Sequence, residues 1–140
     1  MTDPFDLQRF LDAQAPIYAR VVAELRRAQK QTHWIWFVFP QLAGLGHSAM
    51  AQRFAIASRE EAVAYLGHGV LGPRLRECTA LVTAVEGRTA REILGSPDDL
   101  KFQSSMTGAV SSDPEFSAAI AKFYGGKPDQ RTLDLLSQRT

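Results

Sequence analysis

The sequence has little cysteine, little net charge and no long hydrophobic run. A single cysteine, Cys78, excludes an internal disulfide framework and any zinc site built from several cysteines. The formal net charge is +1, so no strong overall field directs the protein to nucleic acid or to a membrane surface. The longest apolar run, residues 34–40, is far shorter than the ~20 residues that cross a bilayer. We therefore expect a protein that binds neither nucleic acid nor membranes.

The composition is that of one folded domain. The chain has 140 residues, of which 45% are hydrophobic and 22% are charged, and these fractions are close to the averages for soluble globular proteins. This length predicts a single domain over residues 1–140. Residues 1–7 carry two acidic side chains and no long apolar run, which argues against a secretory signal and predicts a cytoplasmic location.

Apolar residues recur at helical spacing in several segments that end at glycines. The clearest stripe ends at Gly87 and consists of Leu75, Cys78, Leu81, Val82 and Val85. Together these segments predict a mainly α fold, a single compact domain of six or seven short helices.

Helix start signals lie at the beginnings of several of these segments. Ser58 and Glu61, and likewise Thr89 and Glu92, have the spacing of a capping box, in which each side chain accepts a hydrogen bond from the other's backbone N–H. The pair Ser96-Pro97 precedes two acidic residues, which predicts a helix capped by the serine with the proline in its first position.

Residues 32–42 depart from this helical pattern. Over residues 32–40 they hold β-branched and aromatic side chains almost without a polar break. This composition favours a strand, whereas the lack of convincing partner strands favours a helix or an extended coil, because an isolated strand leaves its backbone unpaired. In each case we expect the helices to pack around this central aromatic segment, because burying each large apolar side chain contributes roughly 1.5–3 kcal/mol.

The sequence contains none of the common cofactor and metal motifs. It has no glycine-rich phosphate loop, no zinc-binding H-E-x-x-H helix and no G-x-S-x-G nucleophile turn. His33, His47 and His68 lie far apart and form no pair at i, i+4, so we expect no metal site and no cofactor. We interpret Cys78, on its apolar stripe, as a small buried hydrophobic residue rather than a nucleophile.

A lysine and two serines form the first candidate binding group. Lys101, Ser104 and Ser105 are three and four positions apart, so they are neighbours on one helix surface. A lysine with hydroxyls suits a phosphate or a carboxylate. The alternative is a solvated helix face on which the serines donate to the carbonyl four residues earlier.

The aromatic segment supplies the second candidate group. Trp34 or Trp36 could stack on a planar ligand, although core packing suits at least one of them. Gln41 follows directly and could present its amide to a ligand or cap the loop backbone. If the protein is an enzyme, His33 is the best candidate for acid–base catalysis, because histidine side chains titrate near neutral pH.

Several segments of the sequence carry a resemblance to a known family. They are Phe5-Asp6-Leu7-Gln8-Arg9-Phe10, His33-Trp34-Ile35-Trp36-Phe37-Val38-Phe39-Pro40-Gln41-Leu42, the stretch from Tyr65 to Leu75, Asp99-Leu100-Lys101 and Ser104-Ser105-Met106-Thr107. With them the chain resembles, over nearly its whole length, the bacterial family called domain of unknown function 1810, whose members are often labelled calpastatin. Ile35 replaces the family's methionine, which conserves volume. The resemblance implies a mainly α-helical single domain and brings no established active site.

A weaker similarity links Lys101-Phe102 and the general helical layout to NADAR-type domains, which are associated with ADP-ribose and N-glycosidic chemistry. The glutamate-tyrosine-glutamine helix motif of that family has no clear counterpart in this sequence.

Two functions are open to test. The first is a domain, with or without catalytic activity, that binds a nucleotide-like or anionic small molecule between two walls. One wall consists of His33, Trp34, Trp36 and Gln41, and the other consists of Lys101, Ser104 and Ser105. The second is a non-enzymatic helical module that binds another protein or forms a homodimer.

Overall fold

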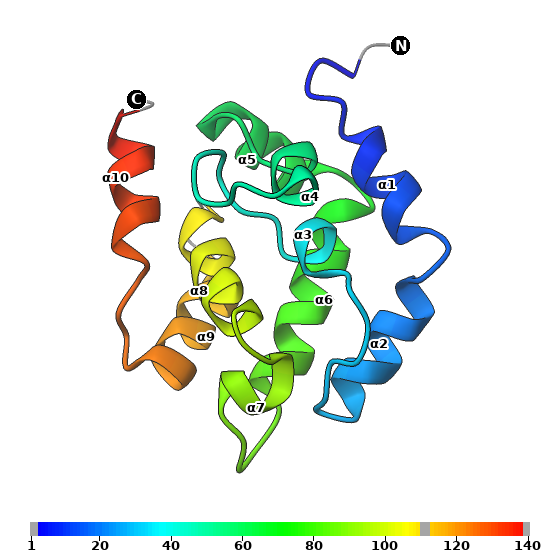
Figure 1. Cartoon of the computed structure of the whole chain (residues 1–140), viewed down its shortest axis with the longest axis vertical. Helices are drawn as coiled ribbons and strands as arrows, with labels where there is room; N and C mark the ends of the chain where they lie inside the picture. The colour runs from blue at the N-terminus through cyan, green and yellow to red at the C-terminus, as the bar shows by residue number, and fades with distance from the viewer. Residues whose placement is uncertain (1–2, 110–112, 139–140) are drawn as a thin grey trace.

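The computed structural model describes residues 3–109 and 113–138, and Figure 1 shows their arrangement. Ten α-helices form within these ranges. They are α1 (Gln8–Gln14), α2 (Tyr18–Arg26), α3 (Ile35–Val38), α4 (Ala49–Arg53), α5 (Arg59–Gly67), α6 (Leu71–Thr83), α7 (Ala90–Leu94), α8 (Asp98–Gly108), α9 (Pro114–Tyr124) and α10 (Gln130–Gln138).

This architecture confirms the predicted mainly α single domain. Six or seven helices were expected, and the additional ones are short: α3, α4 and α7 have only four or five residues. A helix of that length cannot show the repeated apolar spacing by which helices are recognised in a sequence. Among the described residues, no helix has both the length and the apolar character needed to span a membrane.

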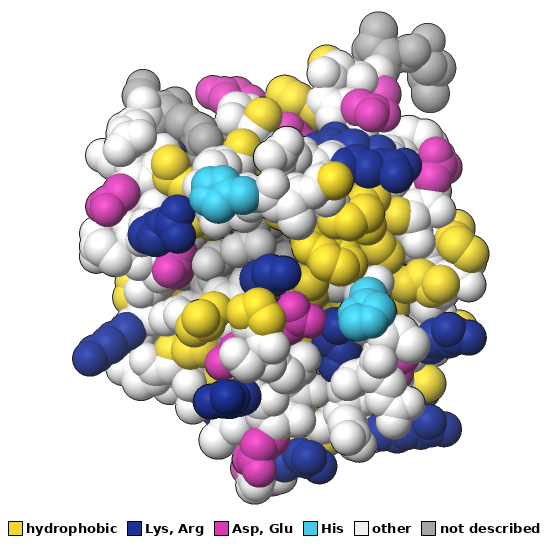
Figure 2. All heavy atoms as spheres, viewed as in Figure 1, with side chains coloured by type: hydrophobic (Ala, Val, Ile, Leu, Met, Phe, Trp, Pro, Cys, Tyr) yellow, Lys and Arg dark blue, Asp and Glu magenta, His cyan; other side chains and the backbone are white. Residues whose placement is uncertain are grey.

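Helix α6 occupies the middle of the molecule (Figure 1) and packs against α2, α5 and α9. Helix α8 packs against α7, α9 and α10, while α3 contacts α1, α6 and α8. Helix α10 stands at one edge in Figure 1. Seen from the same side, the surface carries basic and acidic side chains interspersed rather than separated by sign (Figure 2).

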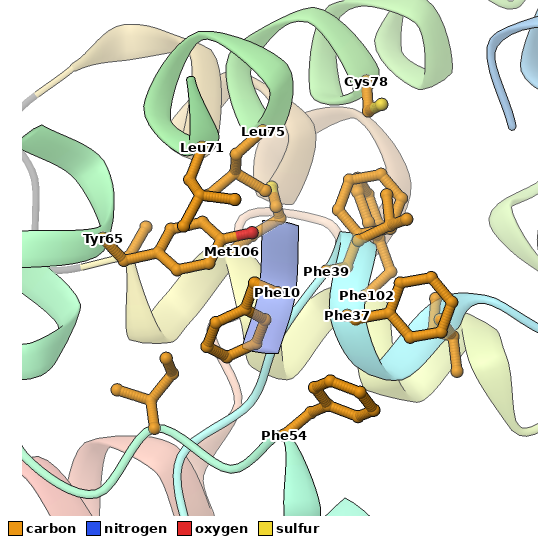
Figure 3. Close-up of a cluster of buried hydrophobic side chains, with 14 of the residues drawn as sticks. Phe10, Phe37, Phe39, Phe54, Tyr65, Leu71, Leu75, Cys78, Phe102 and Met106 are labelled. Carbon is orange, nitrogen blue, oxygen red and sulfur yellow. The ribbon is translucent and has the colours of Figure 1, made fainter. Parts of the chain in front are cut away.

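The aromatic segment lies in the centre of the core, as predicted. Trp34, Phe37 and Phe39 are buried. Figure 3 shows Phe37, Phe39 and Phe102 of α8 in one cluster of buried side chains. The rings of Phe39 and Phe102 meet edge to face with their centroids 4.8 Å apart, a geometry that stabilises aromatic pairs beyond the burial of their surface.

The conformation of this segment combines two of the open alternatives. One helical turn, α3, is followed by extended chain that forms a single parallel bridge between Leu42 and Ile56. The Ile56 N–H donates to the Gln41 carbonyl, and the Ala43 N–H donates to the Ile56 carbonyl, both at 2.9 Å. Backbone groups of the extended part are therefore paired by one bridge, which is why a strand-like composition needs no sheet here.

The two predicted capping boxes differ in the structure. The Thr89 hydroxyl accepts from the Glu92 N–H and the Glu92 carboxylate accepts from the Thr89 N–H, so this box is complete. The Ser58 hydroxyl accepts from the Glu61 N–H at 3.1 Å. The Glu61 carboxylate, however, accepts from the N–H of Ala57 instead of Ser58, so the second box is only half formed and the prediction is corrected to that extent.

The start of α8 is also one residue later than predicted. Pro97 is the residue before the helix rather than its first residue, and Ser96 is not the cap. The reason is that the Pro97 carbonyl already accepts the helical hydrogen bond from the Lys101 N–H, which makes Pro97 the capping position.

Arg9 connects the N-terminal segment to the middle of the chain. Its guanidinium group donates five hydrogen bonds of 2.6–2.8 Å to the carbonyls of Phe5, Asp6, Arg53 and Ala55 and to the Glu61 carboxylate. The Glu61 side chain is only 4% exposed. Arg9 occupies Oε2 of the Glu61 carboxylate and the Ala57 N–H donates to Oε1, so both oxygens have partners other than the Ser58 N–H.

Candidate functional site

A cleft of about 300 Å³ lies where the loop after the aromatic segment meets the first turns of α8 and α10. Its polar lining is formed by Gln41, Lys101, Ser104, Asp129 and Arg131. Leu45, Pro97 and Leu100 form its apolar wall. Lys101 and Arg131 are the two cations of the cleft. The face shown in Figure 2 carries charges of both signs in a mixture, so these two cations are not part of a large basic surface on that face.

Lys101 is held at the edge of this cleft by a tryptophan and a carboxylate. Its ammonium nitrogen lies 5.3 Å from the centroid of the Trp36 ring and 3.7 Å from Asp98 Oδ1. The other carboxylate oxygen of Asp98 lies 2.8 Å from the Lys30 ammonium nitrogen. One carboxylate thus faces two ammonium groups, so Asp98, Lys30 and Lys101 together carry a net positive charge beside the cleft.

Gln41 enters the cleft from a fixed backbone. Its carbonyl accepts the bridge hydrogen bond from Ile56, and its half-buried side chain lines the cleft. Within the part of the chain that the structure describes, the Gln41 amide makes no hydrogen bond. Among the described residues, the amide therefore does not cap the loop backbone.

Ser104 joins α8 to the start of α10. Its hydroxyl lies 3.1 Å from the Leu100 carbonyl and 3.1 Å from Asp129 Oδ2. The same Asp129 oxygen accepts from the N–H and the hydroxyl of Thr132, as an N-cap residue does. Ser104 thus adopts the helix back-bonding of the solvated-face alternative and also lines the cleft.

Four predicted site residues, Ser105, Trp34, His33 and Trp36, lie outside the cleft lining. Ser105 is buried and lines a separate small cavity of about 20 Å³ beside Tyr65. Trp34 is buried in the core. His33 is exposed on the surface and does not line the cleft. Trp36 is half-buried and touches the cleft through Lys101. The structure therefore brings together Trp36, Gln41, Lys101 and Ser104.

Glu24 fixes the entry to the aromatic segment. Its carboxylate accepts hydrogen bonds from the Trp34 indole, from the backbone N–H groups of Gln31 and Thr32, and from the Thr32 hydroxyl, at 2.7–3.1 Å. Burial alone would raise the pKa of the Glu24 carboxyl, but these hydrogen bonds outweigh it and lower the pKa from 4.5 to about 2. The charged carboxylate therefore holds Trp34 in the core.

Cys78 has the environment of a structural residue. It is fully buried on α6, and burial raises the pKa of its thiol to about 12. A nucleophilic cysteine requires a thiolate near neutral pH, so the geometry favours the interpretation of Cys78 as a small core residue.

Asp129 and Arg131 were not among the residues that the sequence indicated. Asp129 did carry a signal, because it follows Gly-Gly-Lys-Pro and precedes the last helical stripe, as an N-cap residue does. Arg131 carried none, since its approach to the Gln41 loop depends on how α10 packs against α8. The Arg131 guanidinium reaches the Gly44 carbonyl of that loop at 3.4 Å.

A model of the family described as "Protein of unknown function (DUF1810)" matches residues 4–136. The chain belongs to the DUF1810 family. This confirms the resemblance read from the aromatic and lysine–serine segments; the similarity to NADAR-type domains stays a prediction.

Among solved structures, the chain is similar to the crystal structure of the conserved hypothetical protein Rv1873 from Mycobacterium tuberculosis. The two share 58% sequence identity and superpose with a TM-score of 0.94, over 96% of this chain and 99% of that one. No curated protein matches the chain. Neither the DUF1810 description nor the name of this neighbour states an activity.

Proposed function

We propose that the protein binds a nucleotide-like or anionic small molecule in the cleft between α8, α10 and the Gln41 loop. The observation that carries this proposal is the meeting of Gln41, Lys101 and Arg131, which come from three distant parts of the chain, around one cleft. An amide and two cations are groups that recognise phosphates and carboxylates.

The size and the apolar wall of the cleft favour a ligand with a body as well as an anionic group. A volume of about 300 Å³ is at the lower end of small-molecule sites. Leu100 is 58% exposed and lies on the wall with Leu45 and Pro97. An apolar or planar group packed there would remove this surface from water, which is favourable.

The proposal is tested by ligand titration with a matched pair of lysine variants. Adenosine 5′-monophosphate, ADP-ribose, NAD and inorganic phosphate are added separately while the melting temperature and tryptophan fluorescence are followed. A true ligand at a hundred times its Kd stabilises the protein by about 2.7 kcal/mol. Lys101→Met should abolish this shift, because it removes a cleft cation.

The matched control is Lys127→Met, because Lys127 is exposed and lies outside the cleft lining. It should respond to ligands as the wild type does. The proposal fails if none of the four compounds changes either signal, or if both lysine variants lose the response equally.

The alternative, a homodimer or protein-interaction module, would use exposed apolar surface. Among the described residues, the large side chains of this kind are Val63, Val70, Leu100 and Leu133. They belong to different elements, and single exposed apolar residues are ordinary on protein surfaces. Sedimentation at increasing concentration decides this question, since a homodimer shows association that a ligand-binding monomer does not.

A further inference from the structure

Asp129 places a carboxylate in a cleft whose other charged groups are cations. It lines the cleft together with Lys101 and Arg131. Its Oδ2 atom accepts from the N–H and hydroxyl of Thr132 and lies 3.1 Å from the Ser104 hydroxyl oxygen. Among the described residues, Oδ1 accepts no hydrogen bond, and Asp129 makes no ion pair.

The N–H and the hydroxyl of Thr132 both donate to Oδ2 and fix the orientation of this carboxylate, and the single hydroxyl proton of Ser104 is shared between Oδ2 and the Leu100 carbonyl. A carboxylate has two oxygens that both accept hydrogen bonds, so Oδ1 remains able to accept from a bound molecule. Because the protein already orders the Asp129 side chain, binding of a ligand to Oδ1 loses little additional side-chain conformational entropy.

From this arrangement we infer that the ligand is a phosphorylated sugar or nucleotide whose sugar hydroxyls donate to Asp129 Oδ1 while its phosphate is held by Lys101 and Arg131. This inference rests on the proposed function of the same cleft, and it makes Asp129 the residue that determines specificity. No bond is made or broken in this binding step.

Charge explains why other anions and other donors fit less well. A bare anion such as phosphate gains from Lys101 and Arg131 but is repelled by the carboxylate of Asp129, and like charges at close range are unfavourable. An ammonium group would satisfy Asp129 but would be repelled by the two cations. A neutral hydroxyl pair satisfies the carboxylate without either repulsion.

The first experiment uses the wild-type protein and three ligands. Affinities are measured by calorimetry for adenosine 5′-monophosphate, for its 2′,3′-dideoxy analogue and for inorganic phosphate. Loss of hydrogen bonds to a charged group should weaken the dideoxy analogue by about tenfold or more relative to the parent nucleotide. Equal affinities of the two nucleotides would overturn the inference and leave the proposed function intact.

The second experiment uses Asp129→Asn, which keeps a side chain that caps helices well. Loss of the negative charge should tighten the binding of inorganic phosphate and weaken that of adenosine 5′-monophosphate, two changes of opposite sign. A purely structural role of Asp129 would shift both affinities in the same direction, and that result also overturns the inference.

Asp134→Asn is the matched control, because it removes a carboxylate from an exposed position of the same helix, α10, outside the cleft lining. It should leave the ratio of the two affinities as in the wild type. If the wild type binds neither nucleotide nor phosphate, the proposed function itself has failed, and the inference about Asp129 fails with it.

Discussion

The Lys101 ammonium nitrogen lies 5.3 Å from the centroid of the Trp36 ring at the edge of the cleft. This contact joins the two sequence segments that were predicted independently as binding groups. The other tryptophan, Trp34, is buried and donates its indole N–H to Glu24. The two tryptophans therefore differ in their distance from any molecule that engages Lys101.

Trp36→Phe should remove the fluorescence response to a cleft ligand. An anion that draws the Lys101 ammonium away from the ring changes the electrostatic environment of the Trp36 indole, whereas Trp34 is shielded in the core. The variant should still bind the ligand by calorimetry, within about fivefold of the wild-type affinity, since one cation–π contact contributes about 0.5–1 kcal/mol at an accessible site. A full fluorescence response from Trp36→Phe would show that Trp34 is the reporter instead.

Glu24 should make stability depend on pH in the acid range. Its folded pKa, about 2, lies below the ordinary value of 4.5, so its contribution is complete above the ordinary value and is lost as the pH falls from 4.5 toward 2. The test is urea unfolding of the wild type and Glu24→Gln at several pH values. The difference in their unfolding free energies should be constant near neutral pH and shrink as Glu24 becomes protonated.

Glu86→Gln is the control for this comparison, because the Glu86 side chain is 87% exposed. Its unfolding free energy should run parallel to that of the wild type at every pH. Asp3 and Glu92 also have lowered pKa values because backbone N–H groups donate to their carboxylates, but their effects are shared by all three proteins. A constant difference between wild type and Glu24→Gln down to pH 2 would contradict the assignment.

Arg9→Lys should destabilise the fold although it preserves the charge. One ammonium group cannot replace a guanidinium fork that serves four carbonyls and a carboxylate. We expect a loss of about 1–3 kcal/mol in the free energy of unfolding, since the buried Glu61 carboxylate and the part-buried carbonyls of Phe5 and Ala55 lose donors. Arg20→Lys, at an exposed position on α2, should change it by less than about 0.5 kcal/mol; equal losses in both variants would contradict this role of Arg9.

Gly72→Ala should destabilise the corner between α5 and α6. A Cβ atom on Gly72 would lie 2.1 Å from the backbone oxygen of Leu66, so the two helices would have to separate. Overpacking of this kind costs about 1–3 kcal/mol. Gly67→Ala is the control, because a Cβ atom there meets nothing within 4 Å, and it should be neutral or slightly stabilising in thermal unfolding. Wild-type stability of Gly72→Ala would show that the corner relaxes freely.

The sequence spacing predicted a helix cap correctly where no distant residue competed for the capping side chains. The Thr89–Glu92 box formed as its spacing predicted, because both partners lie within one helical turn. The Ser58–Glu61 box had the same spacing, but Arg9 approaches Glu61 from 52 residues away and Ala57 takes its other oxygen. A local pattern cannot reveal such a competitor.

The candidate site shows the same division. Gln41 and Lys101 were found from their residue types and neighbours, and both line the cleft. Spacing alone could not decide which serine lines the cleft with Lys101, since Ser104 and Ser105 are both neighbours of Lys101 on a helix. The packing of α8 decides between them: Ser104 faces α10 through Asp129, whereas Ser105 faces the core.

By itself, the order of residues determined a mainly helical domain, a buried aromatic centre and membership of a family, because periodicity, composition and motif strings are local properties of the chain. Which polar groups share one cleft was decided only when α10 docked beside α8 and brought Asp129 and Arg131 to Lys101. That step depends on the burial of apolar faces, and it carries polar residues to positions that their own sequence neighbourhood does not encode.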